Sequence, residues 1–452
     1  KIIQIGAYYD DGNNYSVNRG TVETGDIGIL HSGSGTINTG TITAEDGSTT
    51  GIKVTGTGTV TGGTVELSSN AGGVGVDYQN ASGNVTSMTI NVNGTGQSGI
   101  NAGAAISSSK LNGVKINLNN NESIGINSTN TVDSQATIQN TSNINISNAF
   151  GIKSSGTVNN SGTINLNSNG SVTGIDGTVV TNAGTIKITG HNNGSNNVGA
   201  HGSSSATNNS GHDITVTGYY HNAGLIAPTV TNNGTISVTG SYGDGIYASG
   251  THATSSGTGS SITVTGSYND GVKGNQNANL SSGSTVTMQS GSYNNGVHAV
   301  GGNASVTGSS RINLYRNNFS NGVYAPNGTT TVTNSNIYVG DYNAANDTNN
   351  SNYSNGINLV KSSVANSITG SQIYMKGSNN IGVRAQEPGT LTFNDNTMTM
   401  SGTGNYGLYL APSKSISSIS RNSTTSSGSS NVGIFISEGA KIPNISGGTH
   451  TV

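Results

Sequence analysis

The chain has 452 residues, of which 70 are Gly and 5 are Pro, with no Cys and no Trp. Charged residues make up 8% of the chain and its net charge is −3, so there is no electrostatic basis for binding DNA or RNA. The composition also excludes disulfides, thiolate metal sites and a cysteine nucleophile, and no apolar run reaches the length of a transmembrane helix.

The beginning of the chain carries no recognisable targeting segment. It starts at Lys1 without a signal-peptide pattern, so we expect a piece of a longer protein or a processed form. Residues 1–27 are expected to form a ragged first rung of the repeat, with Gly6-Ala7 as an irregular copy of the repeat's leading dipeptide.

A Gly followed by an aliphatic residue recurs 17 times, from Gly28-Ile29 to Gly433-Ile434, with a mean spacing of about 25 residues. We call these glycines the anchors. Each unit contains three short pieces with alternating polar and apolar residues, as in 151–154, 157–159 and 163–166. Alternation of this kind is typical of strands, whose successive side chains point to opposite faces.

Four or five aliphatic residues per unit cannot form a core alone, but stacked units would bury them in one column. The sequence therefore predicts an all-β fold: a right-handed, single-stranded parallel β-helix with three short strands per rung of about 25 residues, and about 17 rungs. We expect residues 1–452 to form a single such domain. Disorder is the main alternative, but the apolar positions keep their phase throughout.

One bend within the rung repeatedly contains Asn. The residues at this place include Asn140, Asn160, Asn182 and Asn232. Asn tolerates the left-handed backbone conformation of tight corners, so we expect that conformation here. A stacked Asn can also hydrogen-bond to its copy in the next rung. We therefore interpret these Asn residues as structural.

The phrases Thr235-Ile236-Ser237-Val238-Thr239-Gly240 and Gly245-Ile246-Tyr247-Ala248 resemble passenger domains of Gram-negative autotransporters, and are especially similar to large fusobacterial-type adhesins. The resemblance covers nearly the whole chain as a repeat pattern. It implies a rod displayed on the cell surface, or secreted, that binds host or bacterial partners. It also implies a C-terminal translocator barrel, absent from this chain, as the link to the outer membrane.

The most distinctive surface feature lies three residues before successive anchors. Counting back from five consecutive anchors gives only aromatic residues: Tyr242, Tyr268, Tyr293, Phe319 and Tyr353. His221 holds the same place one rung earlier, whereas Asn196, Asn379 and Gly404 hold it elsewhere. Stacked rungs would align these rings in a row able to contact sugar rings or anchor a protein partner. A structural stack that stiffens the corner is the alternative.

Polar residues flank this row directly before the anchors. They are Asp244, Asp270, Asn295, Asn321 and Asn355, and they could hydrogen-bond ligand hydroxyls. A further outward row lies two residues after each anchor and mixes Lys273, His298 and Arg384 with aromatic residues, as in an ordinary solvated sheet face. The one long interval between anchors, 34 residues, predicts a loop inserted near residues 340–355 beside Tyr353.

Enzymes with β-helical folds are the first functional alternative. Asp244 and Asp270 would lie one rung apart, a separation similar to that of a retaining glycosidase pair. However, Asn occupies this place in the next three rungs, which indicates a turn preference instead. The eight His residues are scattered and no metal-ligand set is evident. We therefore expect no catalytic residue, no metal and no cofactor.

The sequence thus favours a non-enzymatic adhesin that binds a cell-surface receptor, either a glycan or a protein, through the aromatic row. The candidate ligand-binding residues are Tyr242, Tyr268, Tyr293, Phe319, Tyr353, Asp244, Asp270 and His221. A β-helical polysaccharide lyase or depolymerase is one alternative. An inert stalk that presents a binding tip outside this chain is the other.

Overall fold

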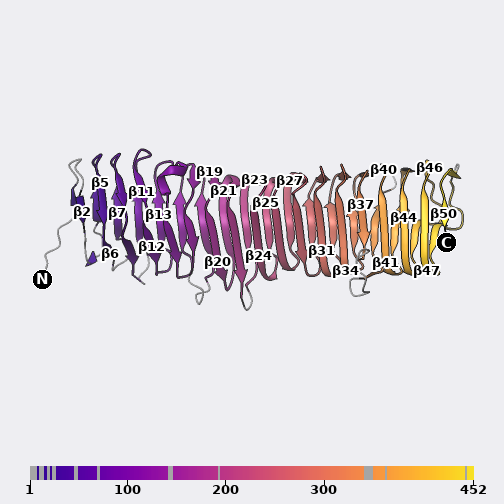
Figure 1. The fold of residues 1–452 in the computed structure, drawn as a ribbon, viewed down its shortest axis with the longest axis horizontal. Coiled ribbons are helices and arrows are strands. Elements are labelled where there is room, and N and C mark those ends of the chain that lie inside the picture. The colour runs from indigo at the N-terminus through magenta and orange to yellow at the C-terminus, as the bar shows by residue number, and fades with distance from the viewer. Residues whose placement is uncertain are drawn as a thin grey trace. The chain divides into compact units, whose positions relative to one another are not determined.

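The computed structural model describes residues 8–9, 15–17, 21–22, 27–44, 49–68, 72–140, 146–191, 194–340, 350–361, 364–442 and 445–451. These residues form a parallel β-solenoid of about 16 turns with three parallel sheets, and the ribbon shows the short strands stacked turn upon turn within each part of the chain (Figure 1). The predicted fold class is confirmed. The ragged start and residues 341–349 of the expected insertion lie largely or wholly outside the described residues.

The contacts divide the chain into two compact units, 1–219 and 220–452. In each unit we number the sheets by the order of their strands within a turn. The described residues contain no α-helix, and none of their helical segments has the length and hydropathy of a membrane span. The helical element is a short 3-10 turn, η1 (Ser108–Leu111), which takes the place of one strand of sheet 2.

The strands of unit 1 pair in parallel with their counterparts in neighbouring turns. Sheet 1 contains β1 (Tyr8–Tyr9), β4 (Ile27–His31), β7 (Thr50–Val54), β10 (Val74–Tyr78), β13 (Ser98–Ala102), β15 (Ile124–Ser128), β18 (Ala149–Ser154), β21 (Val172–Asn182) and β23 (Val198–Asn208). Sheet 2 contains β2 (Tyr15–Val17), β5 (Thr36–Thr39), β8 (Thr59–Thr61), β11 (Asn84–Thr86), β16 (Val132–Ser134), β19 (Thr157–Asn160) and the second halves of β21 and β23. Sheet 3 contains β3 (Thr21–Val22), β6 (Thr41–Ala44), β9 (Thr64–Leu67), β12 (Thr89–Val92), β14 (Lys115–Leu118), β17 (Thr137–Gln139), β20 (Thr163–Ser168), β22 (Thr185–Gly190) and β24 (Asp213–Tyr220).

Unit 2 repeats the arrangement. Sheet 1 contains β25 (Ala223–Asn232), β27 (Asp244–Ser256), β29 (Asp270–Gly274), β32 (Asn295–Ala299), β35 (Asn321–Tyr324), β39 (Asn355–Val360), β42 (Ile381–Glu387), β45 (Tyr406–Leu410) and β48 (Val432–Ile436). Sheet 2 contains the second halves of β25 and β27, then β30 (Asn277–Ser281), β33 (Ala304–Thr307), β36 (Thr330–Thr333), β40 (Ala365–Thr369), β43 (Thr390–Asn394), β46 (Ser418–Ser420) and β49 (Ile445–Ser446). Sheet 3 contains β26 (Thr235–Ser241), β28 (Ser261–Thr265), β31 (Thr285–Ser292), β34 (Arg311–Asn318), β37 (Asn336–Val339), β38 (Ser351–Asn352), β41 (Gln372–Ser378), β44 (Thr397–Thr403), β47 (Ser423–Ser429) and β50 (His450–Thr451).

The core of each unit is a column of aliphatic side chains stacked in register. In sheet 1 of unit 1, Ile126, Ile152 and Ile175 pair directly across β15, β18 and β21, and all three are fully buried. The anchor glycines admit this packing because a Cβ on Gly151 would lie 2.5 Å from the carbonyl oxygen of Gly174 and 2.9 Å from Ile164. The recurrent Gly is therefore required by the close approach of neighbouring rungs.

For the bend at Asn160, Asn182 and Asn232, the predicted side-chain hydrogen bonds between rungs are confirmed. The predicted left-handed backbone is wrong. The Asn160 amide donates to Asn182 Oδ1 at 3.0 Å, and the Asn182 amide donates to Asn208 Oδ1 at 2.9 Å. None of these residues, nor Asn140, has a positive φ. The corner is turned without the left-handed conformation because the side chain bonds backbone groups two residues on, as Asn182 does with both groups of Gly184.

Ile152→Ala is expected to lower the free energy of unfolding by about 2–5 kcal/mol, because it leaves a cavity in the column. Lys153→Ala, on the exposed face of the same strand, is the matched control and should change it by less than about 1 kcal/mol. Urea unfolding followed by far-ultraviolet circular dichroism measures both. Equal effects of the two substitutions would contradict the buried column.

Candidate functional site

Five aromatic side chains form a continuous stack on unit 2, at the corner between sheet 3 and sheet 1. Their ring centroids are 4.7–5.5 Å apart and their planes lie within 15° of parallel. All five are about half exposed, between 48% and 56%. We call this stack the aromatic ladder, and its members are Tyr242, Tyr268, Tyr293, Phe319 and Tyr353. The row predicted from the anchor spacing is therefore a stack in which the inner rings cover each other's faces and present edges to solvent.

The ladder begins in a tilted aromatic cluster. His221 lies 5.6 Å from the Tyr242 ring at an angle of 37°, and Tyr220 lies 5.9 Å from it at 56°. His221, the sixth residue predicted for this row, thus contacts the ladder without continuing its parallel stacking. At this end, the outer face of the first ring is partly covered.

The backbone of the ladder corner is left-handed. Each ladder residue has a positive φ, between 52° and 60°, and so do Asn379, Gly404 and Ser430 at the equivalent corner of later rungs. A side chain other than Gly or Asn costs about 1–2 kcal/mol in this conformation. The fold therefore forms the corner with Asn or Gly as well, and the aromatic residues are not needed to turn the chain.

A buried polar row lies directly inside the ladder, one residue further along each rung. The backbone N–H of Asn269 donates to Asn294 Oδ1 at 2.8 Å, and that of Asn294 donates to Ser320 Oγ at 3.0 Å. The same bond continues through Ser354, Asn380 and Asn405 to Asn431. This row was not predicted from the sequence, although Asn and Ser recur two residues before the anchors. It fixes the corner from which each ladder ring projects.

The two predicted acidic residues lie next to the ladder on the outer face of sheet 1, in adjacent strands and in register. The ammonium of Lys273 is 3.5 Å from Asp244 and 3.3 Å from Asp270, and His298 Nδ1 is 3.1 Å from Asp270. Lys273 also lies 5.2 Å from the centre of the Tyr247 ring. The two carboxyl groups are thus engaged by a cation and an imidazole of the same sheet.

The two carboxyl groups differ in pKa because their surroundings differ. Burial, and then the charge of Asp270, raise the pKa of Asp244 to about 7. Burial acts against the charge of Asp270 too, but His298, Lys273 and Asn295 hold its pKa below the ordinary value. Burial also acts on Lys273, yet the two carboxylates raise its pKa. The cluster therefore favours one ionised carboxylate, on Asp270.

The flanking amides extend this cluster along sheet 1. Asn295 Nδ2 donates to Asp270 Oδ1 at 2.8 Å, Asn321 donates to Asn295 at 3.0 Å, and Asn355 donates to Asn321 at 3.0 Å. All the amide groups point their N–H toward the carboxylate, which stabilises its charge. The residues predicted to offer hydrogen bonds to a ligand are thus largely bonded to one another.

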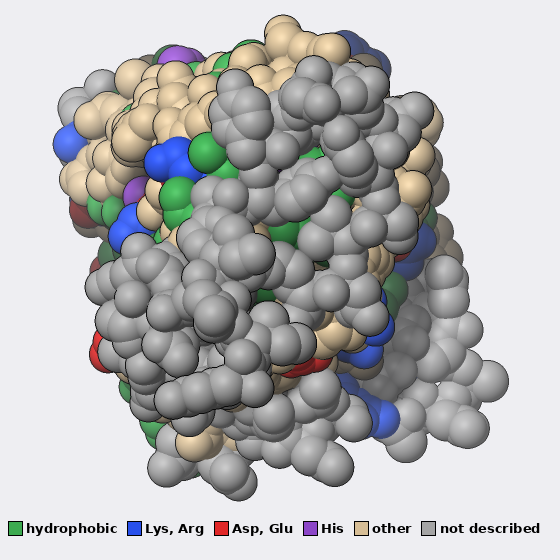
Figure 2. Space-filling model, turned by 90° about the vertical axis from the view of Figure 1, so that its left-hand side faces the viewer, with side chains coloured by type: hydrophobic (Ala, Val, Ile, Leu, Met, Phe, Trp, Pro, Cys, Tyr) green, Lys and Arg blue, Asp and Glu red, His purple; other side chains and the backbone are tan. Residues whose placement is uncertain are grey.

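The outward row two residues after the anchors is mixed, as expected. His298 lies 5.3 Å from Tyr324, and Tyr409 stacks on Phe435 at 5.3 Å and 8°. Two buried polar atoms of this row, Asn358 Oδ1 and Arg384 Nε, have no hydrogen-bond partner among the described residues. Figure 2 faces the N-terminal side of the view in Figure 1, and there charges of both signs are scattered over the visible described surface.

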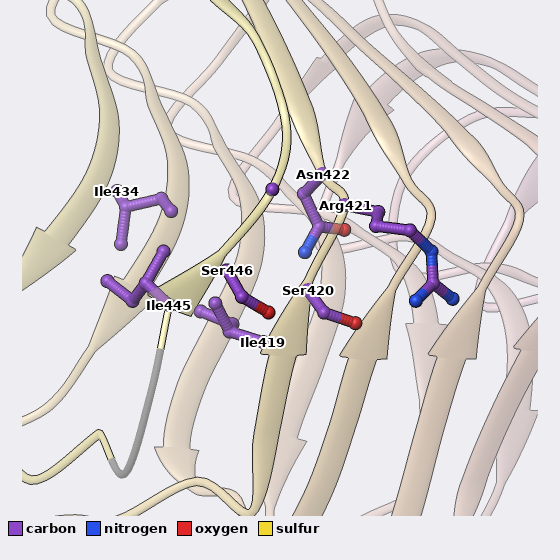
Figure 3. Close-up of a pocket in the computed structure, with 8 residues that line it drawn as sticks. Ile419, Ser420, Arg421, Asn422, Ile434, Ile445 and Ser446 are labelled. Carbon is purple, nitrogen blue, oxygen red and sulfur yellow. The ribbon is translucent and has the colours of Figure 1, made fainter.

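No metal centre is evident in the described part of the chain. No group of three or more His, Asp or Glu residues there could hold a metal ion, and His201 pairs with Asp176 at 2.7 Å in unit 1. A small pocket lies near the C-terminal rungs, where Ile419, Ile434 and Ile445 face one another and Arg421 points away (Figure 3). Ile419 is buried but Ile445 is 48% exposed, and the pocket has almost no free volume, so it is not a candidate site.

Comparison with known proteins identified no relative: no family model and no curated protein sequence matches the chain.

Tyr268→Asn is expected to change the free energy of unfolding of unit 2 by less than about 2 kcal/mol. The substitution removes two ring stacks, each of about 0.5–1.5 kcal/mol, but it relieves a left-handed strain of about 1–2 kcal/mol. Urea unfolding measures the result. A loss above about 3 kcal/mol, comparable to a core truncation, would show that the ladder is a structural element.

Asp244→Asn is expected to stabilise unit 2 at pH 8 by up to about 4 kcal/mol, at 1.36 kcal/mol per unit of pKa change. In the unfolded chain this carboxyl ionises near 3.8, whereas in the folded chain its pKa is about 7. The folded state therefore loses stability as the pH rises between these values, and the loss is complete above the higher one.

Melting temperatures measured from pH 4 to pH 8 test this dependence. The variant and the native chain should be nearly equal at pH 4 and should diverge toward pH 8. A difference that is constant across this range would contradict the burial of a protonatable Asp244.

Proposed function

We propose that this chain is a non-enzymatic adhesin whose aromatic ladder binds a host or bacterial cell-surface receptor, either a glycan or a protein. We further propose that it is part of an autotransporter passenger, displayed on the surface of a Gram-negative bacterium or secreted from it. The fold class and the repeat phrases support this assignment. Its partners on this proposal include no nucleic acid, and it contacts a membrane only through a translocator barrel outside the chain.

One observation carries the proposal: five half-exposed aromatic residues hold strained corners where Asn379 and Gly404 serve the same turn in the next rungs. Backbone strain retained without a folding requirement is typical of functional positions. Exposed Tyr side chains also supply large contact areas at low entropy cost, as in many recognition surfaces. In an inert stalk these rings would contribute only their stacking, about 0.5–1.5 kcal/mol per pair, which the strain of about 1–2 kcal/mol per residue largely offsets. The exposed ladder therefore favours binding.

The paired carboxyl groups are the feature that a lyase or depolymerase would use. Their unequal pKa values are of the kind found in acid–base pairs. However, the Lys273 ammonium lies within 3.5 Å of both groups, and a chain of amides is bonded to Asp270. Because a cation and a chain of amides occupy the polar atoms of the pair, the contacts favour a non-catalytic role beside the ladder.

The test is adhesion of a variant in which all five ladder residues, Tyr242, Tyr268, Tyr293, Phe319 and Tyr353, are replaced by Asn. Because Asn suits the left-handed corner, the variant should remain folded, and we expect at least a tenfold loss of binding to host or bacterial cells. Tyr374→Thr is the control, since it removes an aromatic residue of sheet 3 where the next rung holds Thr399. Undiminished adhesion by the folded five-residue variant would refute the proposal.

A further inference from the structure

Among the described residues, Tyr353 is the ladder ring whose outer face has no neighbouring ring. Each inner ring has a neighbour on both sides at 4.7–5.5 Å. A third ring cannot enter between two such rings, because each stacked pair alone needs about 4.5 Å or more between centroids. Tyr353 stacks on Phe319 on one side only, and it is the most exposed ring of the ladder at 56%.

The next corner along the solenoid holds no aromatic ring that could cover this face. Asn379 occupies it with the same left-handed backbone, and its N–H donates to Thr403 as the rung pairing requires. Its side-chain oxygen leans toward the following rung, because a Cβ on Gly404 would lie 2.8 Å from Asn379 Oδ1. The exposed amide makes no hydrogen bond with another described side chain. The flat apolar face of Tyr353 is thus followed, one rung further on, by the exposed side-chain amide of Asn379.

Resting on the proposed function, we propose that the outer face of Tyr353 binds one pyranose ring of a cell-surface glycan. The apolar C–H face of the sugar stacks on the negative face of the aromatic ring and continues the ladder at its own spacing. The Asn379 amide, which can both donate and accept, hydrogen-bonds the hydroxyl groups at the edge of the sugar. The inner rings stiffen the platform and contact the receptor through their edges only.

This arrangement matches the general chemistry of sugar recognition. A binding site for a small neutral ligand needs an apolar surface and a few placed polar groups, and both are supplied here by consecutive corners. A protein segment would instead need a wider apolar area than the single free ring face. The ladder therefore ends in a subsite of one sugar unit.

The test replaces Asn379, which lies outside the ladder, and leaves every ladder ring in place. Asn379→Arg puts a guanidinium over the Tyr353 face, where it stacks on the ring. Arginine is compatible with the backbone, since Arg316 and Arg421 have φ of 54° and 51°. Asn379→Gly copies Gly404 and leaves the face open. Ser430→Arg adds the same charge at an equivalent corner and is the matched control.

The readout is binding to an array of neutral and sialylated oligosaccharides, with melting temperatures to confirm folding. We expect Asn379→Arg to weaken binding at least tenfold, Asn379→Gly to weaken it only a few fold, and Ser430→Arg to leave it unchanged. Unchanged binding by folded Asn379→Arg would overturn the sugar subsite, as would binding to no oligosaccharide by the native chain.

The same series separates the subsite from the proposed function. If the five-residue ladder variant loses adhesion while Asn379→Arg keeps it, the ladder binds a receptor along its edges and the sugar subsite is wrong. If the ladder variant adheres like the native chain, both proposals fail. Equal losses from Asn379→Arg and Ser430→Arg would indicate a charge effect and would also overturn the subsite.

Discussion

The structure depends on the close approach of equivalent residues in neighbouring rungs. Parallel pairing in register places the same position of the repeat in contact with its copy in the next rung. Aliphatic residues therefore pack on aliphatic residues, and amides hydrogen-bond to amides. The anchor glycines allow this approach, since a Cβ on Gly151 would collide with the backbone of the next rung. Each row is thus formed by one position of the repeat. The candidate site is formed by the position three residues before the anchor, in the five rungs where it holds an aromatic residue.

Two rows of opposite character meet at the ladder corner. Inside, Asn and Ser side chains accept the backbone N–H groups of the preceding rung and are almost completely buried, as Asn294 and Asn380 are. Outside, the rings stack on one another and remain half exposed. The inner row holds the backbone in its left-handed turn, so the outer row is free of that task. The outer residue of this corner can therefore vary while the inner Asn or Ser residue is kept.

The sequence predicted the features that depend on period, because alternation and spacing determine which residues share a face and a row. The predicted pieces 151–154, 157–159 and 163–166 lie within strands β18, β19 and β20. The aromatic row and the column through Ile152 also follow from the period. The sequence did not predict features that depend on the sign of φ or on how far a side chain reaches. The left-handed turn was expected at Asn160 and occurs instead at the ladder corner, and period alone does not show that Lys273 bridges two carboxyl groups.

The corner accepts Tyr, Phe, Asn, Gly and Ser with nearly the same backbone. Each rung contacts only its neighbours, so an exchange at one corner has no distant effect on folding. Selection can therefore alter the displayed surface one step at a time, lengthening or shortening the run of rings without any compensating change in the interior. Such a scaffold separates the evolution of recognition from the evolution of stability.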